Sequence, residues 1–272
     1  MNKRKFLRVY TPFARSQFQA ELAYKGNTIM FFCGHGILIA VTFFLWKAIY
    51  SSSSNAVMEG FSFNEMIVYM LIAFITNLLV SSDVSSIVSR EVKDGSIAIN
   101  LIRPINYSIR MMFQSIGTIL FNFVIVFLLA FLIITITFYK LEGSLNMGNI
   151  ILYFVSCALS MLLTFYYSYC FGLLAFKITN MWGLSQIMQA IFRLFSGSLI
   201  PLAFFPKVIG TIFSYLPFSS MISTPTLIYL GKLSDFEIIK GLLIQLIWLL
   251  VFIGISKWMW NKLIKQLTIL GG

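Results

Sequence analysis

The chain has 272 residues, of which 59% are hydrophobic and only 11% are charged. Soluble globular domains carry about 25% charged residues, so this composition excludes an ordinary soluble domain. Lysine and arginine outnumber aspartate and glutamate by 20 to 9. Because these basic residues flank apolar runs, membrane topology explains their excess better than nucleic-acid binding does. The sequence therefore predicts an all-α integral membrane protein.

The first 27 residues predict an amphipathic helix at the membrane surface. The segment is basic but lacks the apolar core and small residues of a cleavable signal peptide. Apolar side chains recur at steps of three and four residues, at Leu7, Tyr10, Ala14, Phe18 and Leu22. Such a helix lies among lipid headgroups and is attracted by anionic lipids. Pro12 is expected to bend this helix or to mark its start.

Six apolar stretches are predicted to cross the bilayer, which takes about 20 helical residues. They cover about residues 29–50, 64–80, 112–139, 150–176, 182–205 and 238–257. His35 in the first stretch is interpreted as a hydrogen-bonded packing residue, with a proton relay as the alternative. Cys33, Cys157 and Cys170 all fall in apolar runs, which favours buried thiols over a disulfide or a metal site.

The longest polar interval, residues 81–110, lies between the second and third spans. Short oxygen-bearing side chains at residues 81–83 can cap a helix start. A short amphipathic helix with a glycine stop is predicted from the spacing of Val84, Ile87, Val88, Glu91 and Gly95. A helix held between two spans can transmit force from an outside partner. An ordinary connector between spans is the alternative interpretation.

Two rows of polar side chains lie within predicted spans. In the fourth span, hydroxyl side chains recur every four residues at Ser156, Ser160, Thr164 and Ser168. Small side chains on one face let helices approach closely, so we favour packing over a substrate path. In the fifth span, a polar stripe is formed by Gln186, Gln189, Arg193 and Gly197. An arginine at mid-membrane costs about 2.5–3.5 kcal/mol on insertion scales, so this stripe should face protein or water. Two interpretations stay open: Arg193 bonds to carbonyls or to a partner subunit at a dimer interface, or the stripe lines the translocation path.

The stretch after the fifth span predicts an interrupted hairpin. Pro201 and Pro206 disfavour one continuous helix. We therefore expect residues 201–217 to form a short hairpin, partly re-entrant from the outer face, since irregular backbone is allowed there where protein covers it. Residues 219–237 are expected to form an outer connector before the sixth span.

Basic residues predict the orientation of the chain. Placing both termini in the cytosol puts most lysines and arginines inside, and leaves Lys47, Lys140, Lys207, Lys232 and Lys240 outside. This asymmetry agrees with the excess of positive charge in cytosolic loops. The interval at residues 81–110 is therefore also predicted to be cytosolic.

The sequence offers no chemistry of its own for hydrolysing ATP. No G-x-x-x-x-G-K-[ST] motif occurs, and Gly231-Lys232-Leu233-Ser234 lacks the required upstream glycine. One histidine and no clustered carboxylates leave neither a metal site nor an acid–base pair, and no cofactor is predicted. The chain is therefore not expected to be an enzyme, and an active pump would need a separate energy-supplying subunit.

Two motifs resemble those of a known family. Glu91-Val92-Lys93-Asp94-Gly95-Ser96, followed by Leu101-Ile102-Arg103-Pro104-Ile105, resembles the E-x-x-x-G-[ST]…L-x-[RK]-P signature of ABC-2 type exporter permeases. Residues 195–202, 205–206 and 216–218 are similar to that family's segment around the fifth span. The resemblance covers nearly the whole chain, in the right order around the spans.

This resemblance implies six spans, an interfacial elbow helix at the N-terminus and two short outer helices that close the exit. We therefore expect the helix at residues 83–93 and its stop at Gly95 to couple to an ATP-binding cassette ATPase, with Val84, Ile87 and Val88 inserted into a groove of that ATPase and Glu91 beside them. The resemblance implies an acidic residue at this contact, and it implies that the fifth span borders the conduit. The implied protein is the permease subunit of an ATP-driven exporter in a bacterial plasma membrane, paired with a second permease, identical or related. Alternatives are an energy-independent channel, a secondary transporter, or an intramembrane enzyme or assembly factor. The substrate cannot be read from the sequence.

Overall fold

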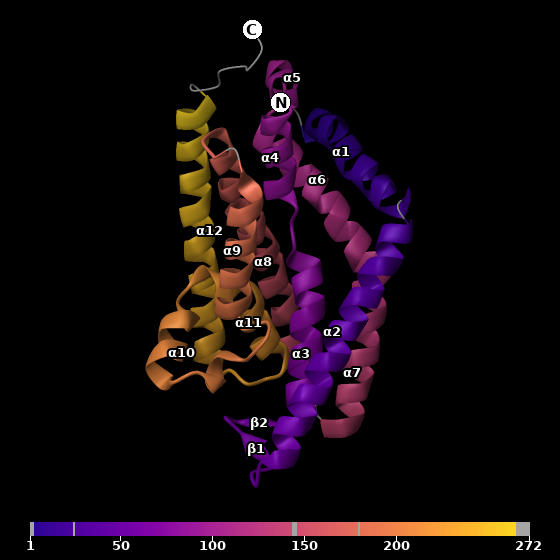
Figure 1. The fold of residues 1–272 in the computed structure, drawn as a ribbon, viewed down its shortest axis with the longest axis vertical. Helices are drawn as coiled ribbons and strands as arrows, with labels where there is room; N and C mark the ends of the chain where they lie inside the picture. The colour runs from indigo at the N-terminus through magenta and orange to yellow at the C-terminus, as the bar shows by residue number, and fades with distance from the viewer. Residues whose placement is uncertain (1–2, 24, 143–145, 179, 265–272) are drawn as a thin grey trace.

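The computed structural model describes residues 3–23, 25–142, 146–178 and 180–264, which form an elongated helical bundle (Figure 1). The start of α1 and the end of α12 lie at the same end of the bundle as α4 and α5, and the hairpin β1–β2 lies at the other. In chain order the elements are α1 (Lys3–Ala23), α2 (Lys25–Ser52), β1 (Val57–Met58), β2 (Phe61–Ser62), α3 (Phe63–Val80), α4 (Val84–Lys93), α5 (Ser96–Ile102), α6 (Tyr107–Asn122), the π-helical η1 (Phe123–Phe127), α7 (Leu128–Glu142), α8 (Met147–Leu173), the 3₁₀-helical η2 (Leu174–Phe176), α9 (Met181–Phe195), η3 (Leu202–Phe204), α10 (Lys207–Ser214), α11 (Pro217–Tyr229) and α12 (Asp235–Leu263).

The described residues contain five helical stretches long and apolar enough to cross a membrane. They are Cys33–Ser52, Phe63–Lys93, Tyr107–Leu141, Met147–Phe176 and Asp235–Leu263. The sequence predicted one more, over residues 182–205, but α9 ends at Phe195. Gly197 adopts φ 74°, a left-handed conformation typical of the residue after a helix. The 15 residues of α9 are shorter than the about 20 needed for a span.

Helix α1 forms where an amphipathic helix was predicted, and it packs along α6. Pro12 lies inside α1, so it does not mark the helix start. Tyr10 is buried, its ring centroid lies 5.5 Å from that of Phe113, and its hydroxyl accepts a hydrogen bond from the Asn106 amide at 2.9 Å. Of the predicted segment, residues 1, 2 and 24 lie outside the described part of the chain.

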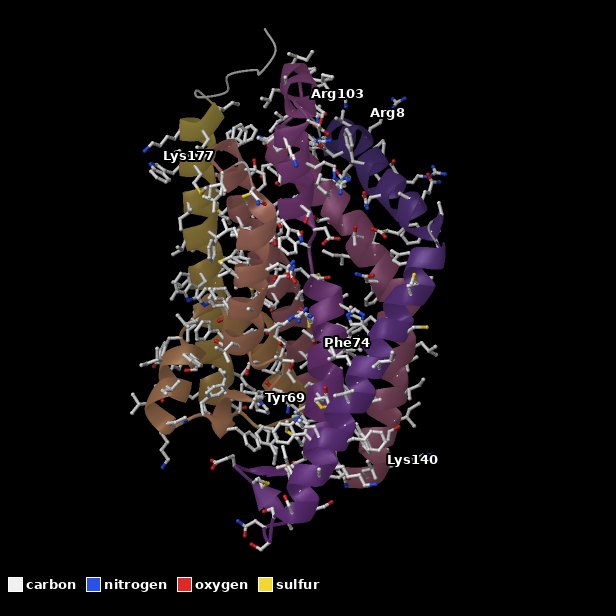
Figure 2. The ribbon with its side chains drawn as sticks, in the orientation of Figure 1. Arg8, Tyr69, Phe74, Arg103, Lys140 and Lys177 are labelled. Carbon is white, nitrogen blue, oxygen red and sulfur yellow. The ribbon has the colours of Figure 1, made fainter. Side chains whose placement is uncertain are left out.

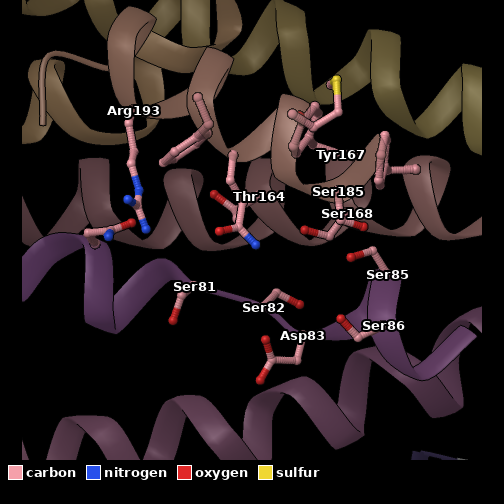
Figure 3. Close-up of a pocket in the computed structure, with 15 residues that line it drawn as sticks. Ser81, Ser82, Asp83, Ser85, Ser86, Thr164, Tyr167, Ser168, Ser185 and Arg193 are labelled. Carbon is pink, nitrogen blue, oxygen red and sulfur yellow. The ribbon is translucent and has the colours of Figure 1, made fainter. Parts of the chain in front are cut away.

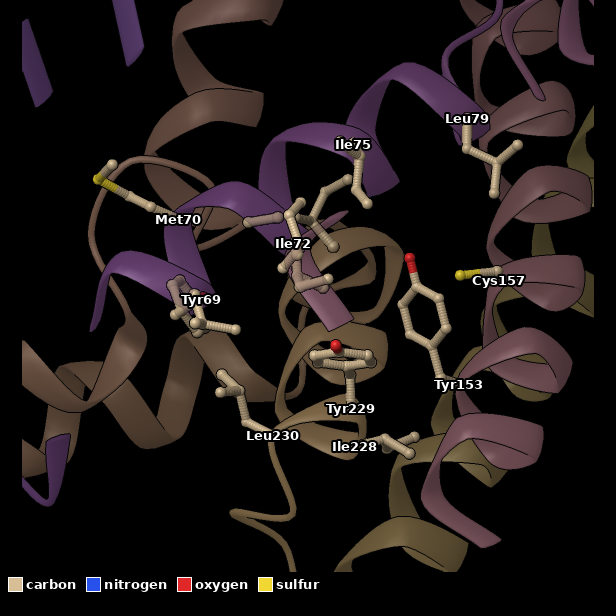
Figure 4. Close-up of a cluster of buried hydrophobic side chains, with 14 of the residues drawn as sticks. Tyr69, Met70, Ile72, Ile75, Leu79, Tyr153, Cys157, Ile228, Tyr229 and Leu230 are labelled. Carbon is tan, nitrogen blue, oxygen red and sulfur yellow. The ribbon is translucent and has the colours of Figure 1, made fainter. Parts of the chain in front are cut away.

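Helices α3, α8 and α11 meet in a large apolar core rich in tyrosine (Figure 4). Tyr69, Tyr153 and Tyr229 are nearly fully buried. Each phenol has a partner, because a buried hydroxyl without one costs free energy. Tyr153 shares a hydrogen bond with Thr76 at 2.8 Å, and Tyr229 shares one with Thr135 at 2.9 Å. These bonds fix the lateral positions of α3 and α7.

The predicted packing role of the hydroxyl row is confirmed at its first two members. Ser156 and Ser160 are fully buried, and both bond to the amide of Gln245 on α12, at 2.9 and 3.0 Å from Nε2. The same amide donates to the carbonyl of Ser220 on α11 at 2.7 Å. One glutamine therefore joins α8, α11 and α12. Thr164 and Ser168, in the next turns of α8, line a cavity instead.

The outer connector predicted at residues 219–237 is wrong for its first half. Residues 217–229 form α11, which is buried against α3, α8 and α12. Pro217 is tolerated because it stands in the first helical turn, where an amide has no partner to lose. Thr226 stays in the helix by donating to the Ile222 carbonyl at 2.7 Å. Serine and proline are common in loops, so their frequency in this segment favoured a loop over the helix that forms.

The end of the bundle that carries β1 and β2 is closed by contacts between distant segments. Strands β1 and β2 form an antiparallel hairpin with Val57 opposite Ser62. Lys232, just before α12, forms an ion pair with Glu65 at the start of α3. The Lys232 ammonium also donates to the Gly60 carbonyl at 2.9 Å. The connector into α12 is thereby fixed to the hairpin.

Helix α2 lies largely on the outside of the bundle. Cys33 is exposed, so the prediction of a buried thiol is wrong there, whereas Cys157 and Cys170 are buried. The His35 ring lies 5.2 Å from that of Phe74, a packing contact with α3. Exposed apolar side chains such as Ile37 and Phe44 on α2 are those expected to face lipid.

Candidate functional site

Helices α4 and α5 form a bent helical pair that lies at one end of the molecule (Figure 1). The predicted stop is confirmed: Gly95 lies between the two helices with φ 76°. Asp83 occupies the N-cap position of α4, but its side chain makes no capping hydrogen bond. At the other end of α4, the Ser96 hydroxyl and amide donate to the Asp94 carboxylate, and these bonds lower the pKa of Asp94.

The apolar face of α4 points into its own chain. Val84 and Val88 are 1% and 0% exposed, and both pack in a second core with Phe165, Tyr169 and Leu173 of α8. Ile87 is half-buried at the edge of that core. The expectation that these side chains are offered to an outside partner is therefore wrong for Val84 and Val88. Amphipathic spacing identifies the buried face of a helix, but not which chain covers it.

Glu91 is engaged within the chain. Arg110 of α6 donates from one Nη2 to both carboxylate oxygens, at 2.6 and 2.8 Å, and the Tyr107 hydroxyl donates at 2.7 Å. The Arg110 and Glu91 side chains are only 9% and 14% exposed. The Arg110 guanidinium also lies 5.1 Å from the centre of the Tyr107 ring. The acidic residue predicted to contact an ATPase thus fastens α4 to α6.

The exposed apolar surface of this element lies on α5, whose last residues belong to the family-like motif but were not predicted to contact a partner. Ile99 is 58% exposed and Ile102 is 83% exposed, beside exposed Arg103 and Pro104. The clue in the sequence was Ile102 at the last helical position, directly before Arg103-Pro104. Ile99 and Ile102 are therefore apolar side chains that the described chain leaves uncovered at this end of the bundle.

Only three of the four residues of the predicted polar stripe lie on α9 and share its exposed face. Gln186, Gln189 and Arg193 are exposed along α9. Gly197 lies beyond the end of the helix, is buried, and accepts a hydrogen bond from the Tyr69 hydroxyl at 2.8 Å. Gly197 therefore belongs to the core rather than to the stripe.

Gln189 and Arg193 line a cavity of about 290 Å³ between α9, α8 and the junction of α3 with α4 (Figure 3). Hydroxyl side chains dominate the opposite wall, with aromatic side chains beside α9. The lining residues are Asn77, Ser81, Ser82, Asp83, Ser85, Ser86, Thr164, Tyr167, Ser168, Phe171, Ser185, Met188, Gln189, Phe192 and Arg193. This cavity joins the predicted α9 stripe to the second half of the α8 hydroxyl row.

A second cavity, of about 570 Å³, lies between α1, α4 and α6. Ser82, Asp83 and Ser86 line both cavities, so the two adjoin at the break between α3 and α4. The larger cavity also carries Arg90 and the Glu91 carboxylate. Basic residues lie near both ends of the bundle, with Arg8, Arg103 and Lys177 toward the α5 end and Lys140 at the other (Figure 2).

The described residues are mostly helical and contain five potential spans, which is the architecture of a multi-pass membrane protein. The family model described as ABC-2 family transporter protein matches residues 37–271. The chain therefore belongs to the ABC-2 family of transporter permeases. No curated protein matches it.

Proposed function

We propose that the chain is the permease subunit of an ATP-driven exporter, working with a separate ATP-binding cassette ATPase. The observation that carries this proposal is the α4–α5 element. It lies at one end of the bundle, exposes Ile99 and Ile102 at its tip, and is tied to α6 and α8 by the Glu91–Arg110 pair and the Val84–Val88 packing. A tip that binds a partner and a base that is fixed to long helices can pass movement into the membrane. ATP hydrolysis is assigned to the partner.

Ile99 and Ile102 at the tip of α5 are free to contact the ATPase, whereas Val84 and Val88 are buried in their own chain. Burial of two aliphatic side chains contributes about 1.5–3 kcal/mol each before ordering costs are subtracted. Arg103 directly follows Ile102, Lys93 and Asp94 stand at the end of α4, and all three are exposed. They give the rim polar groups, as is typical of protein interfaces.

Replacement of Ile102 by Asp is expected to reduce recovery of the ATPase by about tenfold or more, because it buries an unpaired carboxylate in the contact. The measurement is co-purification of the tagged chain with the ATPase, followed by ATPase and export assays in lipid. Val57 is 56% exposed on the β1–β2 hairpin, at the end of the bundle opposite α5. Val57→Asp is therefore the matched control and should behave like the wild type. Full ATPase recovery and export with both Ile99→Asp and Ile102→Asp would show that α5 is not the docking surface.

A second permease, identical or related, is proposed to cover the polar stripe of α9. Gln186, Gln189 and Arg193 are exposed on the single chain, and such groups are costly to leave in lipid. A partner permease or a water-filled conduit would satisfy them. The short α9 and the segment at residues 196–216 are proposed to form the sixth, incomplete membrane crossing with a re-entrant outer hairpin.

We assign both termini to the cytosol of a bacterial cell. The support is the concentration of lysine and arginine toward the N-terminus and the α4–α5 element. In a Cys33→Ser background, Ser54→Cys should react with a membrane-impermeant maleimide in intact cells. Ser96→Cys should react about tenfold less until the cells are permeabilised. The reverse pattern would invert the orientation and remove α5 from the cytosol.

A further inference from the structure

The cavity behind α9 has one positively charged lining residue, Arg193. Among the described residues, no carboxylate lies within ion-pair distance of its guanidinium. Asp83, the acidic lining residue, lies on the opposite side of the α3–α4 connection from Arg193 and Thr164 (Figure 3). The end of the cavity at Arg193 is therefore electropositive and lacks a counter-charge within the described chain.

The same cavity holds buried polar groups that the protein leaves unpaired. Thr164 is 6% exposed, and its hydroxyl has no hydrogen-bond partner among the described residues. The Tyr167 hydroxyl, one turn along α8, is also without one in the described structure. Most buried polar side chains in folded proteins are hydrogen-bonded, so these two hydroxyls are exceptions. Both oxygens expose almost no surface to a water-sized probe, so a ligand in the cavity reaches the Thr164 hydroxyl only after the threonine side chain rotates to another staggered rotamer.

The arrangement of donors favours a phosphate ester over a carboxylate. Arg193 approaches from α9, whereas the hydroxyls of Thr164 and Ser168 come from α8 and that of Ser85 from α4. A tetrahedral oxyanion offers acceptor oxygens in several directions, and a guanidinium can hold two of them. Phe171 and Phe192 line the same cavity and offer apolar surface.

We propose that this cavity is a binding site for the phosphate group of an amphiphile, held by Arg193 and the Thr164 hydroxyl, with the start of its apolar chain against Phe171 and Phe192. A volume of about 290 Å³ is at the small end for ligand sites, so it accommodates a headgroup and not a whole two-chain lipid. The site deepens the proposed function, because the amphiphile is either the exported substrate or a membrane lipid that regulates export; its binding requires no ATPase.

The test uses the purified full chain in nanodiscs of phosphatidylcholine, without ATPase or ATP. The probe is dodecyl phosphate with a photoreactive diazirine in its chain, and the crosslinked peptides are located by mass spectrometry. We expect labelling of α8 and α9 peptides, reduced about tenfold by Arg193→Gln, as expected for loss of a charge-assisted hydrogen bond. Thr164→Val, which keeps the side-chain shape, should reduce it several-fold.

Two variants control for general effects. Arg15→Gln removes the same charge from exposed α1, and Thr137→Val removes a hydroxyl that bonds only to its own helix on α7. Neither should change labelling. A dodecyl glucoside probe of the same design should not label α8 or α9, and a phosphatidic acid probe distinguishes a lipid source from a single-chain one. Competition by inorganic phosphate would assign the site to free phosphate instead of an amphiphile.

Equal labelling by the phosphate and glucoside probes, or labelling unaffected by both Arg193→Gln and Thr164→Val, would overturn the assignment. Thermal unfolding of each variant shows whether it is folded, and Arg193→Lys provides a second variant that keeps the charge but loses the planar fork. A chain that binds the probe but never recruits an ATPase would retain this site and refute the proposed function instead.

Discussion

Replacing Arg110 by Met is expected to lower the free energy of unfolding by roughly 3 kcal/mol, because it leaves the Glu91 carboxylate largely buried with only the Tyr107 hydroxyl as a partner. Breaking one side of a buried pair costs more than removing both sides. The double variant Glu91→Gln/Arg110→Met should therefore recover much of the loss. The measurement is thermal unfolding in detergent, followed with a thiol-reactive dye that reports exposure of Cys157 and Cys170 in a Cys33→Ser background.

Two further substitutions serve as a control and as an intermediate case for the Arg110→Met variant. Arg90→Met removes a charge from the exposed face of α4 and should leave the melting temperature almost unchanged. Arg110→Lys keeps a charge but loses the planar guanidinium that lies 5.1 Å from the centre of the Tyr107 ring, so its melting temperature should fall between those of Arg110→Met and the wild type. An Arg110→Met protein that melts with the wild type would mean that the pair does not hold α4 to α6.

Gly117→Val is expected to release α1 from α6. A Cβ at position 117 would lie 2.3 Å from the Ala14 carbonyl oxygen and 2.8 Å from the Gln17 Cβ, so backbone rather than a flexible side chain must move. Overpacking costs about 1–3 kcal/mol where side chains can adjust, and this clash is with backbone. The gap opened would also break the bond from Gln114 to Gln17, now 3.1 Å.

A disulfide between cysteines placed at Gln17 and Gln114 measures that separation. The disulfide should form readily in the parent chain. Its yield should fall by about tenfold with Gly117→Val, which corresponds to about 1.4 kcal/mol of lost association between α1 and α6. Gly34→Val is the matched control, because nothing lies within 4 Å of a Cβ built at that helical glycine of α2. Unchanged crosslinking with Gly117→Val would show that α1 does not depend on this close approach.

The parts of the fold that could be predicted from sequence are those governed by hydropathy. The long spans of α2, α3, α8 and α12 lie where apolar length required them. The α4 helix and its stop at Gly95 followed from polar patterning and one glycine. These signals are local, and no tertiary contact competes with them.

The features that the sequence could not predict depend on contacts between distant residues. Helix α11 read as a loop because serine, threonine and proline usually favour one, yet burial against α3, α8 and α12 makes helix the better state. In the candidate site, helical spacing placed Val84 and Val88 on one face but could not show that α8 covers it. The role of Gln245 could not be predicted either, because nothing in the sequence near a single glutamine in a span shows which distant residues it will bond to.

Helix α8 contributes to both apolar cores, with Tyr153 and Cys157 in the one that contains α3 and α11, and Phe165 and Tyr169 in the one that contains α4. Its 27 residues extend about 40 Å at 1.5 Å per residue. A well-packed helix of that length tilts as a stiff rod. A rocking of only a few degrees where α4 rests on it therefore displaces Tyr153, near its other end, sideways by an ångström or more, so a tilt at the core that contains α4 also moves the core that contains α3 and α11.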